Sequence, residues 1–169
     1  MIIKENLKDL LKSLKFAESK GVYSKSFKDI DATLKVDFEN KKLIYPDKEK
    51  GFIINGRQIC NFEPNENFVV FECVHRLFEK GYKPEHIELE EKWQVGHGAS
   101  GGRADISVKD NFGKSLFIIE CKTEVKEHND ELLRTKTNSD GVSSLCSLLI
   151  LFHTRAQRMQ RQIIIPTRN

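Results

Sequence analysis

The strongest constraint on the fold of this sequence is a pair of apolar runs at residues 103–108 and 115–121, joined by the segment KDNFGK. The runs are rich in Ile, Val and Phe, whereas the connecting segment is rich in turn-forming residues. This pattern predicts an antiparallel hairpin. A turn centred between Phe112 and Gly113 decides which residues of the two strands face each other, and it places Asp105 opposite Glu120.

The predicted hairpin gathers charged groups at one end of an otherwise apolar ribbon. Side chains alternate along a strand, so Lys122 projects on the same face as Glu120. Two carboxylates in facing positions destabilise a sheet unless something neutralises them. Mg²⁺ does so, because it commonly binds one or two carboxylates together with phosphate oxygens and water. The residues therefore predict a Mg²⁺ site with Asp105 and Glu120 as ligands, and a lysine placed to activate a water that attacks a phosphodiester.

Hydrophobic periodicity predicts further elements along the chain. Helical spacing of apolar residues predicts helices at about 4–16 and 65–81, and a polar helix is a candidate at about 127–136. Alternating apolar and polar residues predict strands at 22–27, 32–38, 42–45 and 87–93. This order predicts an α/β (α+β) fold in which helices flank a mixed sheet. The dipeptide Glu63-Pro64 separates a small N-terminal α/β lead-in, 1–62, from a core at 63–137.

The last part of the chain, 138–169, differs from the rest in composition. Residues 141–169 contain four arginines and neither lysine nor acidic residues, although the whole chain of 169 residues has a net charge of only +3. One interpretation is a basic amphipathic helix that touches nucleic acid. The preferred interpretation is a truncated or frame-shifted end that has not been selected to fold against the core.

Several classes of protein are excluded by the same composition. No apolar run of eighteen residues is present, so no membrane helix is expected. The charged start, MIIKENLKDLLKSL, lacks the apolar core of a signal peptide, and the four cysteines are widely spaced. These features are typical of a protein of the reducing cytoplasm.

The residues of the hairpin resemble a known signature. The stretches GRADI, residues 102–106, and IIECK, residues 118–122, are similar to the two halves of the PD-(D/E)XK nuclease motif. The chain most resembles the N-terminal nuclease domain of type I restriction enzymes and of single-chain restriction-modification proteins. The resemblance covers residues 63–125 well and residues 1–62 more loosely. A Gln-x-x-x-Tyr motif that follows in those domains does not occur here.

This resemblance implies roles for individual residues. Asp105 and Glu120 would bind Mg²⁺, and Lys122 would position and activate the attacking water. Glu72 on the preceding helix would join them as a catalytic and metal-binding residue. DNA would be contacted by the segment Gly101, Gly102 and Arg103.

The resemblance also implies a function and its partners. The expected activity is that of a Mg²⁺-dependent DNA endonuclease domain of a type I-like restriction-modification system, acting on double-stranded DNA. Its partners would be the translocase, methyltransferase and specificity subunits or domains of the same system. One alternative is a catalytically silent remnant or DNA-binding module with the same fold, and another is a junction-resolving nuclease that acts as a homodimer.

Overall fold

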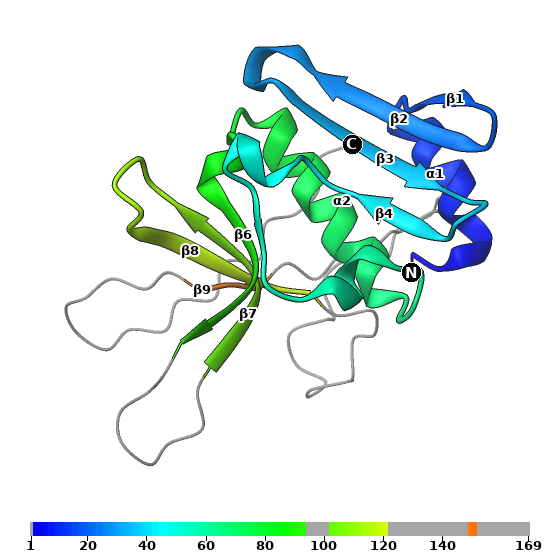
Figure 1. Cartoon of the computed structure of the whole chain (residues 1–169). Coiled ribbons are helices and arrows are strands. Elements are labelled where there is room, and N and C mark those ends of the chain that lie inside the picture. The colour runs from blue at the N-terminus through cyan, green and yellow to red at the C-terminus, as the bar shows by residue number, and fades with distance from the viewer. Residues whose placement is uncertain (1, 94–101, 122–148, 152–169) are drawn as a thin grey trace, which may run out of the picture.

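The computed structural model describes residues 2–93 and 102–121 and, by their backbone, residues 149–151. The helix α2 (Glu66–Glu79) lies between two sheets (Figure 1). The α-helices are α1 (Leu7–Ser13) and α2 (Glu66–Glu79). The first sheet contains, in order, β1 (Ala17–Ser19), β2 (Val22–Phe27), β3 (Ala32–Asp37) and β4 (Lys42–Ile44), all antiparallel. The second contains β5 (Ile53–Ile54), β6 (Ile87–Trp93), β7 (Gly102–Lys109), β8 (Ser115–Glu120) and β9 (Leu149–Leu151).

The core is built around α2, which is buried on nearly every side. Of its 14 residues, 11 are buried. A helix that is buried on most of its surface belongs to the interior of a protein, and most of the buried residues of α2 are apolar. Phe71 packs its ring against those of Phe16 and Tyr45, and Phe78 packs against Phe27. These contacts seat the helix against the N-terminal sheet, and Gly81, with a φ of +87°, follows its end as predicted.

The second sheet is mixed, since β5 runs parallel to β6 and the other neighbours are antiparallel. Its core-facing residues lie in register across three strands, where Ile106 pairs with both Leu89 and Ile119. All three are almost completely buried. A central helix between two small sheets makes this a mixed α+β fold.

The predicted strands at 22–27, 32–38, 42–45, 87–93, 103–108 and 115–121 are confirmed to within a residue or two at their ends. The strand at Ala17–Ser19 was not predicted. β5 lies in the predicted lead-in, and it pairs with β6 of the predicted core. The predicted lead-in and the predicted core therefore contribute to the same sheet and to one continuous hydrophobic core.

Part of the C-terminal segment also contributes to the fold. The backbone of Leu149–Leu151 adds β9 to the free edge of β8, pairing Ile150 with Ile119. The expectation of a tail that does not fold against the core is therefore wrong for these three residues. The predicted helix at 127–136, Gly101, Lys122 and the rest of the basic segment lie outside the described residues. In the described part of the chain, no helix is long and apolar enough to cross a membrane.

A buried histidine joins α2 to the N-terminal sheet. The Lys25 ammonium donates to His75 Nε2 at 2.7 Å, to Glu79 Oε1 at 2.9 Å and to the Leu14 carbonyl at 2.8 Å. His75 is fully buried between the rings of Phe16 and Phe27. Burial, followed by the charge of Lys25, lowers the pKa of His75 to about 4. The folded protein therefore holds this imidazole neutral.

This arrangement predicts a loss of stability in mild acid. In the unfolded chain His75 takes up a proton below its ordinary pKa of about 6.5, whereas in the folded chain it does so only below about 4. The contribution of neutral His75 to the free energy of unfolding is complete above pH ~6.5. It declines between pH ~6.5 and ~4, by at most about 1.4 kcal/mol per pH unit. Urea unfolding of wild type and His75→Phe at several pH values measures it. A stability difference between the two that does not change across this window would contradict the prediction.

Candidate functional site

The ribbon of β7 and β8 has the register that the sequence predicted. Ile106 pairs with Ile119, and Ser107 pairs with Ile118. Continuing this register by one step brings Asp105 opposite Glu120, the last residue of β8. The described strands therefore bring the two predicted carboxylate residues to the same end of the ribbon.

The turn of this hairpin differs slightly from the prediction. Asp110 N–H donates to the Lys114 carbonyl at 2.9 Å, so the loop is centred on Phe112 rather than between Phe112 and Gly113. Gly113 has a φ of +74°, which is the conformation that a three-residue hairpin loop requires. A bulge between Val108 and Lys109 shifts the register by one residue. The bulge thus restores the predicted pairing along the strands.

Asp105 is held firmly at the end of the ribbon. Its side chain is 8% exposed, and its Oδ2 accepts the backbone N–H of Cys121 at 2.6 Å. Cys121 is buried, and its Sγ lies 3.8 Å from Sγ of Cys73 on α2. Lys122 is the next residue in the sequence and lies outside the described residues. This hydrogen bond from the main chain of Cys121 therefore fixes the Asp105 carboxylate beside the Glu-x-Lys stretch, residues 120–122.

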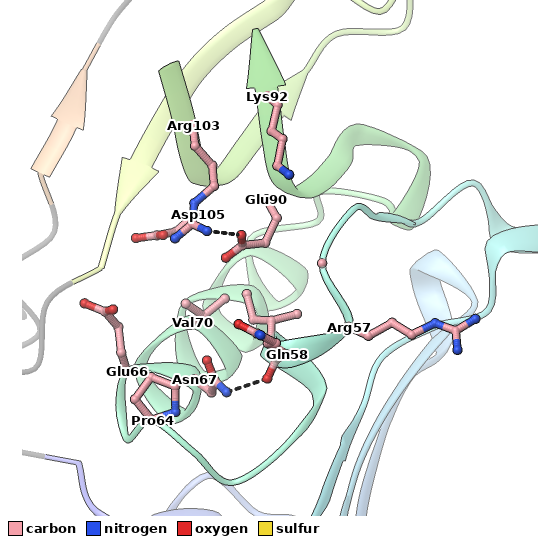
Figure 2. A pocket seen from close by; sticks show the side chains of 12 residues that line it. Arg57, Gln58, Pro64, Glu66, Asn67, Val70, Glu90, Lys92, Arg103 and Asp105 are labelled. Atoms are coloured by element: carbon pink, nitrogen blue, oxygen red, sulfur yellow. Dashed lines mark hydrogen bonds and ion pairs between the residues drawn. The ribbon is translucent and has the colours of Figure 1, made fainter. Parts of the chain in front are cut away.

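Asp105 also lines a pocket of about 420 Å³ between α2, β6, β7 and the 3₁₀ turn Arg57–Cys60 (Figure 2). Three of its side chains are acidic and three are basic. These are Glu66, Glu90, Asp105, Arg57, Lys92 and Arg103. The pocket thus joins elements that are far apart in the sequence, with both signs of charge around a buried carboxylate.

Asn67, in the first turn of α2, holds one wall of this pocket. Its Nδ2 group donates to the carbonyls of Gln58 at 2.8 Å and Glu63 at 3.1 Å, and it is only 7% exposed. Figure 2 shows the bond to Gln58. These bonds tie the 3₁₀ turn to the start of the helix. The sequence assigned no role to Asn67, and its only signal is an amide among the apolar residues of α2.

Glu72 does not line this pocket. Residues of an α-helix advance by about 100° each, so Glu72 projects about 200° round the helix from Val70, which does line it. Glu72 is 1% exposed, and its Oε1 accepts from Arg76 Nε at 2.9 Å and Nη2 at 2.5 Å. The acidic residue that α2 brings to the pocket is Glu66, to which the sequence assigned no place in the site.

The predicted DNA contact Arg103 lies at the mouth of the pocket. Its side chain is 59% exposed, and Nη1 donates to Oε2 of Glu90 at 3.0 Å. Gly102 begins β7, whereas Gly101 lies outside the described residues. No pattern in the sequence distinguishes Glu90 from the other acidic residues of the chain. Its φ of +58° is rare for a residue with a side chain, and nothing in the local sequence indicates it.

The donor groups can be compared with what a metal ion requires. Within residues 2–93 and 102–121, no group of three or more His, Cys, Asp or Glu residues is arranged to hold a metal ion. Asp105 and Glu120 nevertheless offer hard carboxylate oxygens. Mg²⁺ often takes only one or two protein carboxylates and completes its shell with water and phosphate oxygens. The donor chemistry therefore fits Mg²⁺ bound in that way.

Comparisons with models of protein families, with curated proteins and with solved structures find no match to this chain.

Proposed function

We propose that this chain is a Mg²⁺-dependent nuclease domain that hydrolyses phosphodiester bonds of double-stranded DNA. The observation that carries the proposal is the β7–β8 register, which leads to Asp105 facing Glu120 at the end of the ribbon. The bond from Cys121 N–H to Asp105 supports it, because it fixes one carboxylate beside the Glu-x-Lys stretch. A fixed carboxylate needs little reorganisation when a reaction begins.

Each residue of the proposed site would have a separate role. Asp105 and Glu120 would hold Mg²⁺. Glu66 of α2 lines the same pocket as Asp105. Bound there, Mg²⁺ would neutralise the facing carboxylates and polarise the phosphodiester. Lys122 would orient the attacking water from the strand end and favour loss of its proton. Glu72, the helix residue that the sequence indicated, is given a structural role because its carboxylate bonds Arg76.

Basic side chains around the same pocket support a nucleic-acid substrate. Arg57, Lys92 and Arg103 line it, and arginine and lysine supply most contacts to DNA phosphates. A pocket for a small apolar molecule would instead be lined mainly by apolar and aromatic side chains. Action within a type I-like restriction-modification system, alongside a translocase, a methyltransferase and specificity subunits, belongs to the same proposal and is supported by the motif at residues 102–122.

Lys122→Ala separates metal binding from cleavage. We expect the variant to bind Mg²⁺ in calorimetry as well as wild type does, because the carboxylates remain. Its cleavage of supercoiled plasmid is expected to fall by about 10²–10⁴-fold, the usual contribution of a group that acts on the attacking nucleophile. Lys114→Ala, in the turn of the same hairpin, is the matched control. Undiminished cleavage by Lys122→Ala would contradict the assignment of this lysine.

The second candidate function is DNA binding without cleavage. The three basic side chains of the pocket favour it, together with the lack of a three-ligand metal group in the described part of the chain. Calorimetry with Mg²⁺ and DNA separates the two functions. If the chain binds DNA but not Mg²⁺, and Mg²⁺ does not change its affinity for DNA, the binding module is favoured over the nuclease.

A further inference from the structure

Glu90 has an unusual backbone at the edge of the pocket. The β6–β7 ladder continues on both sides of it, pairing Leu89 with Ile106 and Glu91 with Ala104, with no residue inserted. Glu90 itself is absent from the ladder and takes a φ of +58°. Non-glycine residues in this region are strained and persist where the surrounding structure imposes them. The strain brings the Glu90 carboxylate into the pocket lining (Figure 2).

Basic and acidic residues both surround Glu90, and the β6–β7 register places Asp105 opposite it. Lys92 and Arg103 face each other directly across β6 and β7, and like charges in facing positions repel. Glu90 lines the pocket with both and binds Arg103 at 3.0 Å. Its own side chain is 15% exposed against 59% for Arg103, so the carboxylate is the enclosed partner and the guanidinium is the accessible one.

We propose that Glu90 is a positioning residue that competes with DNA phosphate for Arg103. In the free protein Glu90 holds the guanidinium at the pocket mouth, and on binding a phosphate of the DNA backbone takes its place. Glu90 thereby lowers the affinity of the pocket for DNA and sets the position from which Arg103 meets a phosphate. This inference rests on the proposed function, because it assumes that the pocket receives DNA.

Glu90→Gln tests the inference without any need for cleavage. The glutamine keeps the shape of the side chain and removes its charge. We expect its dissociation constant for a fluorescein-labelled duplex, measured by anisotropy in EDTA, to fall by about two- to fivefold, the size of one exposed ion pair. The dependence of log K on log salt should stay close to that of wild type, because Arg103 neutralises the same phosphate in both complexes.

Glu88→Gln is the matched control for net charge. Glu88 lies on the same strand with 13% exposure and binds Lys109 at 2.5 Å, outside the pocket lining. Removal of its charge changes the net charge equally. A gain in Glu90→Gln no larger than in Glu88→Gln would overturn the inference, as would weaker DNA binding by Glu90→Gln.

Arg103→Ala completes the cycle and separates this inference from the proposed function. In the Arg103→Ala background, Glu90→Gln is expected to bring no gain, and a gain that persists there would show that Glu90 does not act through Arg103. If wild type binds DNA more tightly than Arg103→Ala while Glu90→Gln matches Glu88→Gln, only the inference fails. If wild type and Arg103→Ala bind DNA equally, or neither binds, the DNA-binding role of the pocket fails and the inference falls with it.

Discussion

Asp105→Asn is expected to lose DNA cleavage by at least about 10²–10⁴-fold and to lose measurable Mg²⁺ binding. The substitution keeps an oxygen that can accept the Cys121 N–H, which wild-type Asp105 accepts at 2.6 Å. The end of the ribbon should therefore stay in place. What disappears is the negative charge that a hard cation requires. Calorimetry with Mg²⁺ and plasmid cleavage measure the two effects separately.

The chain offers a close control for this variant. Asp110, in the turn of the same hairpin, accepts the N–H groups of Phe112 and Lys114 at 2.9 Å each. Asp110→Asn removes the same charge from the same hairpin and also keeps an accepting oxygen. It should leave Mg²⁺ binding and cleavage near the wild-type level. Cleavage that survives both Asp105→Asn and Lys122→Ala would refute the nuclease proposal.

The second large effect is expected from Arg76→Ala, which should destabilise the fold by about 3 kcal/mol. Glu72 is 1% exposed, and its Oε2 has no hydrogen-bond partner among the described residues. Removing Arg76 takes away the cation that binds Oε1 and leaves a buried charge without that compensation. The midpoint and slope of urea unfolding give the change in free energy.

The variant Glu72→Gln distinguishes a structural role of this glutamate from a catalytic one. Because a neutral amide needs no counter-charge, the double variant Glu72→Gln/Arg76→Ala should recover much of the stability that Arg76→Ala loses. Cleavage by Glu72→Gln should remain close to wild type if the residue is structural. A loss of cleavage at unchanged stability would instead return Glu72 to the catalytic role that the motif implied.

Local patterns were sufficient for most of the described strands. The hairpin of β7 and β8 follows from two apolar runs on either side of a turn-forming segment, and both signals act over a few residues. For this reason the pairing of Ile106 with Ile119 agrees with the register read from the sequence, even though the turn is centred one half-residue away. The two-residue strand β5 carries too short a pattern to be recognised.

Such local patterns did not predict the pocket. Glu66, Arg57 and Glu90 line one pocket because the 3₁₀ turn, the start of α2 and β6 pack together, and Asn67 bonds that turn to the helix. Which glutamate of α2 faces the sheet depends on how the buried helix is rotated. Periodicity cannot decide this when apolar residues surround the helix on all sides.

The amino-acid sequence alone determined the ribbon and the position of Asp105 opposite Glu120, because strand alternation and turn chemistry operate between near neighbours. Tertiary packing decided that Glu66 rather than Glu72 enters the pocket. It also decided that Glu90, in a backbone conformation no local motif encodes, binds Arg103. Such contacts join residues distant along the chain, and their geometry is set only when the helix and the two sheets close on a common core.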